Sequence, residues 1–391
     1  MSAAPIDHEA LAAVLRPIGE ARTLPGVAYA SAEVFEWERR HFLAGSWVCA
    51  GRAADLPAAG DQRAVTVAGT GVLLVRDEAG ALRGWFNTCR HRGHELLAPG
   101  TGRRGHGIRC PYHDWVYGLG GECRATPRFG KDGDAVPDPA DFPLVPARVA
   151  EWHGWVFANV SGDAPPLAEH LGNADVVVDG YDAARLVLGA RHDYEVAANW
   201  KLVVENYLEC YHCAPIHPEL CEVTPPGSGQ GYPVRPVGCW AGGPLALREH
   251  AETMSLTGRS LGVPIPGLPA GRRREVGYAA LLPSLLVSPH PDYLMAHRLE
   301  PLAADRTRVE CSWYFPPEAY RRAGFDPAYA QDFWDLVNRQ DWAACESVQR
   351  NTGSPGWRQG PFSPWESDVH AVMAMVARGY ATGTLGPVGV G

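Results

Sequence analysis

Two cysteines and two histidines in the first half of the sequence have the types and spacing of ligands for an inorganic centre. Cys89-x-His91 is followed, across residues 92–109, by Cys110-x-x-His113. Strand-forming residues flank each pair, so each pair is expected at the tip of a hairpin. Two thiolates and two imidazoles suit a tetrahedral zinc ion. They equally suit a two-iron cluster with both cysteines on one iron and both histidines on the other. The spacing alone leaves both open.

The surroundings of these four residues favour the iron cluster. Residues 45–160 are rich in valine, aromatic residues and turn signals, which predicts an antiparallel β domain that needs no metal to fold. The run CPYHDWVY, residues 110–117, supplies aromatic rings that can shield a redox centre. The pattern resembles the Rieske iron–sulfur domain, and the resemblance implies a [2Fe–2S] cluster on the four residues. His94 and His106 are expected to be solvated loop residues.

A second group of metal-binding residue types lies in NWKLVVENYLECYHCAPIHPEL, residues 199–220. The first fifteen of these residues, 199–213, are predicted to be helical. At 100° per residue, one face of that helix carries Leu202, Glu205, Glu209, His212 and Cys213. Carboxylates and an imidazole on an apolar face are costly unless a cation lies there. Pro215 interrupts the helix, so His212 and His217 are expected to converge on one metal ion.

A long helix predicted over residues 327–350 supplies a third ligand. Its inward stripe is apolar except for one carboxylate, and consists of Trp334, Val337, Asp341, Cys345 and Val348. A buried carboxylate must be paired, protonated or bound to a metal, and a salt bridge to an internal arginine is the alternative for Asp341. Together with His212 and His217 it forms the set of two imidazoles and one carboxylate that leaves iron(II) open positions.

Glu209-x-x-His212-x-x-x-x-His217 resembles the signature of the large (alpha) subunits of Rieske non-haem iron oxygenases. The resemblance extends over about residues 30–380 and implies an α+β protein. An antiparallel β Rieske domain, residues 45–160, is followed by a helix-grip (START-like) α+β catalytic domain, residues 161–391. The segment 1–44 is expected to be helical and to pack on the catalytic domain. Residues 223–246 and 255–274 are expected to be long loops, residues 161–166 a linker, and residues 275–288, 292–302 and 306–315 strands.

The same resemblance implies the cofactors and the partners. We expect one [2Fe–2S] cluster and one mononuclear Fe(II) per subunit, with electrons from NAD(P)H delivered by a separate flavin/iron–sulfur reductase or ferredoxin. In the family, the acidic residue at the position of Glu209 connects a cluster histidine of one subunit to an iron ligand of the next. A homotrimer is therefore implied. Many relatives carry aspartate where this chain has Glu209. Asn206 and Glu205 are expected either to support this bridge or to be structural.

The composition narrows the class of protein further. The 391 residues carry a net charge of −9, which argues against a nucleic-acid or anionic-membrane partner. A signal-peptide pattern and an apolar run of 18 residues are both absent from the sequence, so a cytoplasmic protein is expected. The ten cysteines are then expected to be reduced thiols. Cys210-x-x-Cys213 is expected to be inert packing, and the run Arg272–Arg274 to be a solvated loop or a docking site for a ferredoxin.

The substrate is indicated by resemblance alone. Residues 199–220 and the HRLEP segment look most like the branch that oxidatively demethylates quaternary ammonium compounds such as betaines. Aromatic rings are able to bind such a cation, and the candidates are Tyr232, Trp240, Tyr278, Tyr293 and Trp313. Hydroxylation of an aromatic or natural-product substrate is the alternative within the family. Outside it, the alternatives are an electron carrier, against which the second group of ligands argues, and a zinc-stapled binding protein.

Overall fold

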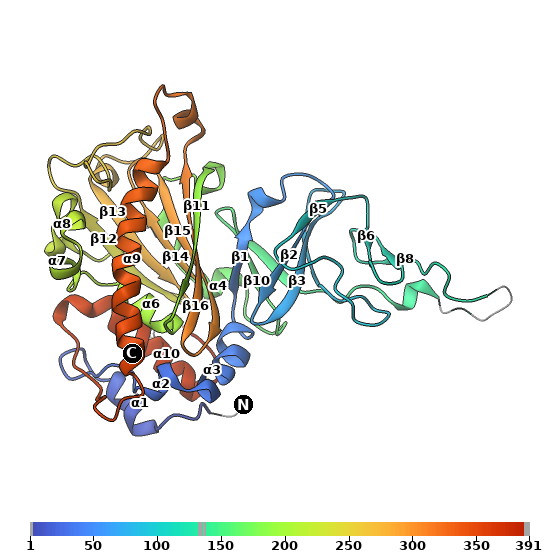
Figure 1. The fold of residues 1–391 in the computed structure, drawn as a ribbon, viewed down its shortest axis with the longest axis horizontal. Helices are drawn as coiled ribbons and strands as arrows, with labels where there is room; N and C mark the ends of the chain where they lie inside the picture. The colour runs from blue at the N-terminus through green and yellow to red at the C-terminus, as the bar shows by residue number, and fades with distance from the viewer. Residues whose placement is uncertain (1–2, 132–135, 137, 387–391) are drawn as a thin grey trace. The chain divides into compact units, whose positions relative to one another are not determined.

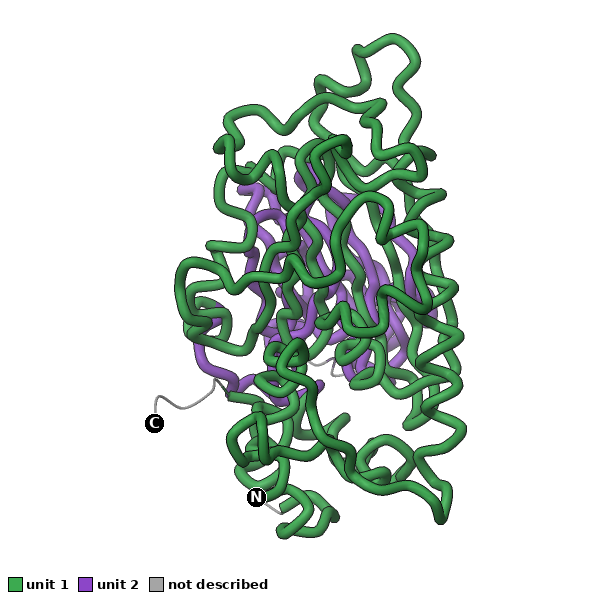
Figure 2. Tube along the Cα trace, turned by 90° about the vertical axis from the view of Figure 1, so that its left-hand side faces the viewer, with its two compact units in different colours: residues 1–42, 168–391 green, residues 43–167 purple. Residues whose placement is uncertain are grey.

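The computed structural model describes residues 3–131, 136 and 138–386. The chain divides into two compact units, one made of residues 1–42 with 168–391 and the other of residues 43–167 (Figure 2). Both units are built on antiparallel sheets, and helices accompany the larger sheet, so the α+β class is confirmed. The exact domain boundaries at residues 45 and 161 remain a prediction.

Three small antiparallel sheets make up the unit of residues 43–167. The first contains β1 (Val48–Arg52), β10 (Trp155–Asn159) and β9 (Arg148–Trp152). The second contains β4 (Leu82–Phe86), β3 (Thr70–Arg76), β2 (Asp61–Val67) and β5 (Gly102–Arg104). The third contains β6 (Ile108–Arg109), β7 (Val116–Tyr117) and β8 (Cys123–Ala125). Alternating valine-rich strands joined by tight turns explain this arrangement.

The segment 161–166 was expected to be a linker, and it is irregular in the structure. It is nevertheless held against its own unit. The Trp47 indole N–H donates to the Pro165 carbonyl at 2.7 Å, and the Arg148 guanidinium lies 5.1 Å from the centre of the Trp47 ring. These contacts fix the last residues of the unit before α4 (Leu167–Leu171) begins.

The unit of residues 1–42 and 168–391 is centred on one six-stranded antiparallel sheet (Figure 1). Its order is β11 (Val187–Val196), β16 (Arg306–Phe315), β15 (Leu294–Ala303), β14 (Leu285–Pro289), β13 (Glu275–Leu281) and β12 (Trp240–Ala246). Strands β13 to β16 lie in the three stretches predicted as strands, the first of which is divided into β13 and β14. Strand β11 was not predicted.

Strand β12 corrects the expectation that residues 223–246 are loop. Its glycines and Pro244 are turn signals in the sequence, but β12 is an edge strand, where proline is tolerated. At Gly242 the backbone has φ 148°, and an added Cβ would lie 2.0 Å from the Tyr278 carbonyl oxygen of β13. The glycine is there because the two strands approach so closely, a reason invisible in the sequence.

Helices cover this sheet, and the long helix α9 (Ala328–Asn351) runs along it (Figure 1). Helices α6 (Trp200–Tyr207) and α10 (Ser367–Thr382) also pack against this sheet. The shorter helices are α1 (His8–Val14), α2 (Val27–Ala30), α3 (Ala32–Glu38), α5 (Asp175–Val178), α7 (Cys213–Ile216) and α8 (Pro218–Val223). In α9 the predicted stripe is buried at Trp334, Val337 and Cys345, whereas Val348 is 41% exposed because it lies near the open end of the helix.

A buried ion pair connects α3 to α6. Lys201 Nζ lies 2.7 Å from Glu38 Oε1, and both side chains are fully buried. Glu38 also accepts hydrogen bonds from the Trp200 indole at 2.9 Å and from the Tyr380 hydroxyl. Because its carboxylate has three partners, its charge is tolerated in the core. The N-terminal segment is thereby joined to the helix that leads into the candidate metal site.

Among the described residues, no helix combines the length and the apolar character needed to cross a membrane.

Candidate metal centres

The two Cys/His pairs of the first unit occupy two equivalent loops. The Cys89 N–H donates to the His94 carbonyl at 2.9 Å, and the Cys110 N–H donates to the Trp115 carbonyl at 2.8 Å. In each loop, this hydrogen bond joins the cysteine to the residue five positions later in the sequence. The loops turn back through left-handed residues, Gly93 at φ 72° and Asp114 at φ 61°. One loop geometry, used twice, presents one thiol and one imidazole from each side.

These residues have the properties that a [2Fe–2S] cluster requires. Cys89 and Cys110 are buried, at 2% and 1% exposure, and the rings of His91 and His113 lie 4.7 Å apart. His91 Nδ1 is buried with no hydrogen-bond partner among the described residues. Burial, assisted by the nearby His113, lowers the pKa of His91, so the ring stays neutral and its lone pair is free for iron. The four residues fit the cluster.

Tyr117 is a cluster-side residue that the sequence analysis did not single out. Its hydroxyl accepts the Arg90 N–H at 3.0 Å and lies 3.2 Å from Cys89 Sγ. Because the oxygen already accepts one bond, its own hydrogen is free to point at the sulfur. Hydrogen bonds to cluster sulfurs are among the factors that set the cluster's potential. His94 and His106 are exposed, as predicted.

The second site is built around a helix that ends early. Residues 199–213 were predicted as one helix, but α6 ends at Tyr207. Glu209 and His212 therefore lie in the connection that follows it. His212 caps the start of α7, and His217 stands between α7 and α8. Pro215 lies inside the short helix α7, so convergence of the two histidines results from their positions at its two ends, a correction to the predicted kink at Pro215.

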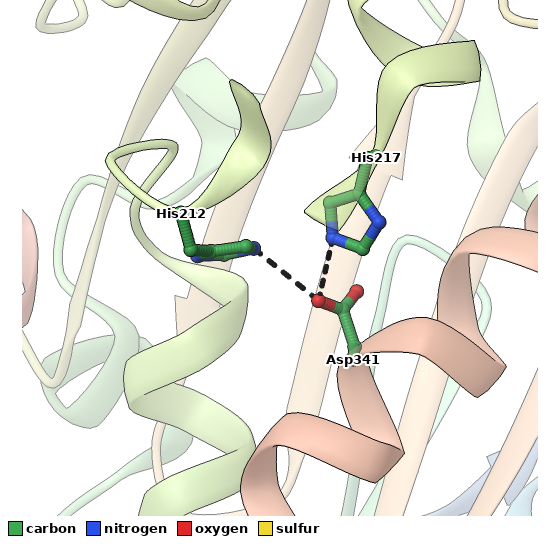
Figure 3. A group of neighbouring side chains, drawn as sticks. All are labelled: His212, His217 and Asp341. Atoms are coloured by element: carbon green, nitrogen blue, oxygen red, sulfur yellow. Dashed lines mark hydrogen bonds and ion pairs between the residues drawn. The ribbon is translucent and has the colours of Figure 1, made fainter. Parts of the chain in front are cut away.

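Three side chains converge at this point, which Figure 3 shows. Asp341 Oδ1 lies 2.8 Å from His217 Nε2 and 3.3 Å from His212 Nε2. The ligand atoms of all three residues lie within 4.8 Å of one another. The alternative of a salt bridge between Asp341 and an internal arginine is not what the structure records. Its partners are the two imidazoles.

Hydrogen bonds on the far side of each ring fix which nitrogen faces Asp341. The Gln340 amide donates to Glu219 at 3.4 Å, so its oxygen accepts the Nδ1–H of His217 at 2.7 Å. Glu209 accepts the Nδ1–H of His212 in the same way. When the two rings are neutral, as metal binding requires, both Nε2 atoms therefore carry the lone pair. Such outer partners orient ligating histidines, and the trio fits a mononuclear metal.

The electrostatics of the site favour positive charge. Burial alone would raise the pKa of Asp341, but hydrogen bonds from His212 and His217, when those rings are protonated, keep it below its usual value. Burial alone would lower the pKa of His212, yet its bonds to Asp341 and Glu209 raise it to about 9. The surrounding carboxylates thus attract a cation to this point, where a divalent metal is the stronger candidate.

Glu209, Asn206 and Glu205 have different surroundings. Glu209 accepts hydrogen bonds from the main-chain N–H groups of Tyr211 and His212 as well as from the His212 ring. The Asn206 amide nitrogen lies 3.5 Å from His212 Nε2. Glu205 instead accepts a hydrogen bond from the Tyr29 hydroxyl at 2.7 Å, and burial raises the pKa of Glu205 to about 7.

One further expectation, about the cysteines, is corrected in this unit. Cys210 and Cys213 form a disulfide and are not free, inert thiols; the bond brackets Tyr211 and His212. The guanidinium groups of Arg272–Arg274 donate to main-chain carbonyl groups, among them those of Val176 and Ala251. These arginines hold neighbouring loops together, and Arg273 and Arg274 remain exposed, as expected for a solvated segment; docking of a ferredoxin there stays a prediction.

A cavity of about 310 Å³ opens onto the metal trio. Its aromatic walls are Tyr207, Tyr278, Trp334, Trp342 and Trp365, and its acidic residues are Glu209, Asp341 and Asp368. Neither lysine nor arginine occurs among the described residues that line it. Of the five cage rings expected from the sequence, only Tyr278 lines the cavity. The other four are buried in the packing of the unit, because the strand register that decides which rings face inward was unknown.

Two protein-family models match the parts of the chain that contain these two sites. The model of the family described as ring hydroxylating alpha subunit (catalytic domain) matches residues 183–382, and that of the Rieske [2Fe–2S] domain matches residues 46–143. The chain belongs to the ring-hydroxylating alpha-subunit family. The first match contains all three residues of the metal trio, and the second contains both Cys/His loops. A Rieske oxygenase of this family carries a [2Fe–2S] cluster and a mononuclear iron, uses electrons from NAD(P)H and needs a reductase.

Individual relatives of this Rieske oxygenase are oxygenase subunits. It is 27% identical over 385 residues to the glycine betaine monooxygenase oxygenase subunit of Pseudomonas aeruginosa, covering 91% of this chain and 88% of that one. It is 37% identical over 213 residues to the carnitine monooxygenase oxygenase subunit of Acinetobacter pittii, covering 51% and 54%. The crystal structure of the quaternary ammonium Rieske monooxygenase CntA with an inhibitor has a TM-score of 0.79 at 25% identity, covering 97% and 99%.

Proposed function

We propose that this Rieske oxygenase removes a methyl group from a small quaternary ammonium compound by oxidising it. The observation that carries the proposal is the cavity that contains the metal trio. Its walls are aromatic and acidic, and no lysine or arginine lies among the described lining residues. Aromatic faces attract quaternary ammonium ions by cation–π interaction. The relatives named for glycine betaine and carnitine support the same class.

Asp368 adds a counter-charge to this argument. It lies in the first turn of α10 and lines the cavity. Glu209 and Asp341 are occupied by the site histidines, whereas Asp368 lines the cavity together with Trp365. Burial raises the pKa of Asp368, which shows that its charge is incompletely solvated. A cation in the cavity relieves that cost.

In this proposal the chain supplies binding, orientation and proton handling. His212, His217 and Asp341 hold the iron, which when bound supplies activation of dioxygen. The cavity walls hold an N-methyl group toward the trio. The reaction takes a trimethylammonium group, dioxygen, two electrons and two protons to an N-hydroxymethyl compound and water. The product then releases formaldehyde and a proton to leave a dimethylamine. Asn206, whose amide nitrogen lies beside His212 Nε2, is proposed to orient His212 at the iron site.

We further propose that Glu209 connects the two redox centres across a subunit boundary in a homotrimer. Its carboxylate already accepts the Nδ1–H of the iron-ligand histidine His212. In this arrangement the same carboxylate also accepts a hydrogen bond from a neighbouring subunit's cluster histidine. Inter-subunit electron transfer is part of what the structure of a quaternary ammonium Rieske monooxygenase is described as revealing, which supports the proposal.

The experiment measures dioxygen uptake and formaldehyde release together. The enzyme is reconstituted anaerobically with iron and sulfide, supplied with a reductase, and given glycine betaine, carnitine or an aromatic acid. Demethylation predicts formaldehyde in step with dioxygen for a quaternary ammonium compound. Dioxygen uptake with an aromatic acid, giving a hydroxylated product and no formaldehyde, would assign ring hydroxylation in its place.

A further inference from the structure

Two side chains in the wall of the cavity have buried polar atoms that nothing in the described chain satisfies. His297 of β15 is 2% exposed and Trp342 of α9 is 9% exposed, and both line the cavity. His297 Nδ1 and Trp342 Nε1 have no hydrogen-bond partner among the described residues. Their rings are neighbours, with centroids 6.2 Å apart. A buried polar group without a partner has lost its hydration with nothing in return, so such groups in a binding cavity indicate a ligand.

A chain of hydrogen bonds determines that His297 Nδ1 is an acceptor. Asp335 is a carboxylate held by Arg339 at 2.8 Å, so it accepts the Tyr194 hydroxyl proton at 2.8 Å. The Tyr194 oxygen is then left to accept the Asn338 amide N–H at 3.5 Å. This orientation turns the Asn338 amide oxygen toward the histidine.

The last bond of the chain runs from Asn338 to His297. His297 Nε2 lies 3.2 Å from Asn338 Oδ1 and must donate to it. The neutral ring therefore carries its lone pair on Nδ1. Burial lowers the pKa of His297 to about 4, so the ring stays neutral at physiological pH and does not repel a cation.

The two unsatisfied atoms are thus a matched acceptor and donor. The Trp342 indole only donates, and His297 Nδ1 only accepts. A hydroxyl group both donates and accepts, which makes it the simplest group able to serve both. A carboxylate lacks the proton that His297 requires, and an ammonium group lacks the lone pair that Trp342 requires.

We propose that His297 and Trp342 form a hydroxyl-binding subsite, so that the enzyme prefers a quaternary ammonium compound carrying an alcohol group over the same compound without it. This inference rests on the proposed function and specifies its substrate class. The hydroxyl donates to His297 Nδ1 and accepts from Trp342 Nε1, while the trimethylammonium group lies among the aromatic walls. The compound without a hydroxyl leaves both atoms unpaired, and sites built for a hydroxyl reject analogues that lack it.

The test compares pairs of compounds that differ only in the hydroxyl. One pair is L-carnitine with γ-butyrobetaine, and the other, which has no carboxylate, is choline with ethyltrimethylammonium. For the wild-type enzyme, KM from formaldehyde release and Kd from calorimetry are both expected to be about tenfold lower for the hydroxylated member, as a well-placed pair of hydrogen bonds predicts. In His297→Phe and in Trp342→Phe, this ratio is expected to fall to within about twofold of one.

The chain offers matched controls. His290 and Trp313 are fully buried and also have an unpartnered ring nitrogen, but neither is among the described residues that line the cavity. His290→Phe and Trp313→Phe are expected to keep the wild-type ratio. Thermal unfolding identifies any variant that fails to fold, and the two subsite variants are independent, so either one is sufficient for the test.

The outcomes are distinct. A wild-type ratio near one in both pairs overturns the subsite, as does a ratio that survives both subsite substitutions. Loss of the ratio in the control variants shows a general packing effect and also overturns it. If the wild-type enzyme demethylates all four cations equally, the proposed function stands and the subsite alone fails. If it neither binds nor oxidises any of them, the proposed function fails with it.

Discussion

At the scale of residues, the mononuclear site depends on hydrogen bonds that determine which nitrogen of each histidine ring faces the metal position. Gln340 and Glu209 each accept an Nδ1–H, and the two Nε2 atoms are thereby left to face Asp341. Gln340 directly precedes Asp341 in the sequence, yet its residue type alone does not predict that it orients His217. Only the packing of α9 against α8 brings Gln340 to His217.

Gln340→Leu is expected to weaken iron binding at the mononuclear site without affecting the cluster. Loss of the acceptor frees the His217 ring to rotate or to change tautomer, and outer partners of this kind are worth about 10–100-fold in metal affinity. Competition with an iron(II) chelator measures the affinity, and the visible absorbance of the cluster is the internal control. Gln331→Leu, earlier on the same helix, is the matched variant. Equal iron retention in both variants would contradict the role of Gln340.

Asp368→Asn is expected to raise KM for a quaternary ammonium substrate by about three- to tenfold, since a partly desolvated charge pair is worth about 1 kcal/mol or slightly more. The substitution keeps the shape of the side chain and removes its charge. Inhibition by an uncharged analogue, in which carbon replaces nitrogen, is measured in parallel and is expected to be unaffected. Equal losses for the charged and uncharged compounds would assign Asp368 a role in shape alone.

His290 gives the protein a pH-dependent stability. Burial lowers its pKa to about 3, whereas in the unfolded chain it is about 6.5. Between these values the unfolded state binds more protons, so the free energy of unfolding falls as the pH falls, by at most about 1.4 kcal/mol per pH unit. Urea unfolding between pH 6.5 and 5 is expected to show a flatter dependence in His290→Phe than in the wild type. An identical slope would mean that another group dominates.

At the scale of elements, the short helix α7 and the buried contact between α3 and α6 position the mononuclear site. Helix α6 stops at Tyr207, which allows the following residues to turn and place a histidine at each end of α7. The pair Lys201–Glu38 anchors α6 from the other side. A local turn and a long-range ion pair together set the position of the ligands.

Lys201→Met is expected to destabilise the protein by about 3–5 kcal/mol, because it leaves the Glu38 carboxylate buried without its cation. The double variant Lys201→Met/Glu38→Gln is expected to recover part of that loss. Urea unfolding measures both. The exposed pair Arg308–Asp193, with both side chains 47% exposed, is the control, and Arg308→Met is expected to cost less than about 1 kcal/mol. Similar costs for the two single variants would contradict the importance of burial.

At the scale of the whole molecule, the proposed trimer makes a prediction about mixed subunits. Cys110→Ser removes a proposed cluster ligand and Asp341→Ala removes a proposed ligand of the mononuclear iron, so each variant alone is expected to be inactive. If Glu209 carries electrons between subunits, co-expressed mixed trimers contain some pairs with an intact cluster beside an intact iron site. Turnover is then expected to return to a fraction of the wild-type rate.

Two observations complete this experiment. Adding Glu209→Gln to both subunits is expected to abolish the recovered turnover while both metal sites remain loaded, which metal analysis checks. Mixed trimers that form, retain their metals and show no turnover would contradict electron transfer between subunits.

The sequence determined the parts of this protein whose signal is local. Spacing within Cys89-x-His91 and Cys110-x-x-His113 indicates ligand loops because each loop is closed by its own main-chain bonds. The strands β13 to β16 and the helix α9 were predictable because their periodic patterns are long. His212, His217 and Asp341 could be singled out together because their polar side chains interrupt otherwise apolar stretches.

The tertiary structure decided everything that depends on which distant surfaces meet. The end of α6 at Tyr207, the edge strand β12 beside β13, and the disulfide between Cys210 and Cys213 override the local pattern. Gln340, Asp368 and the neighbouring rings of His297 and Trp342 acquire their roles from strand register and helix packing. The residue type determines which chemistry a side chain can perform. Its burial, its hydrogen-bond partners and the cavity it faces are set only when residues far apart in the chain are brought together.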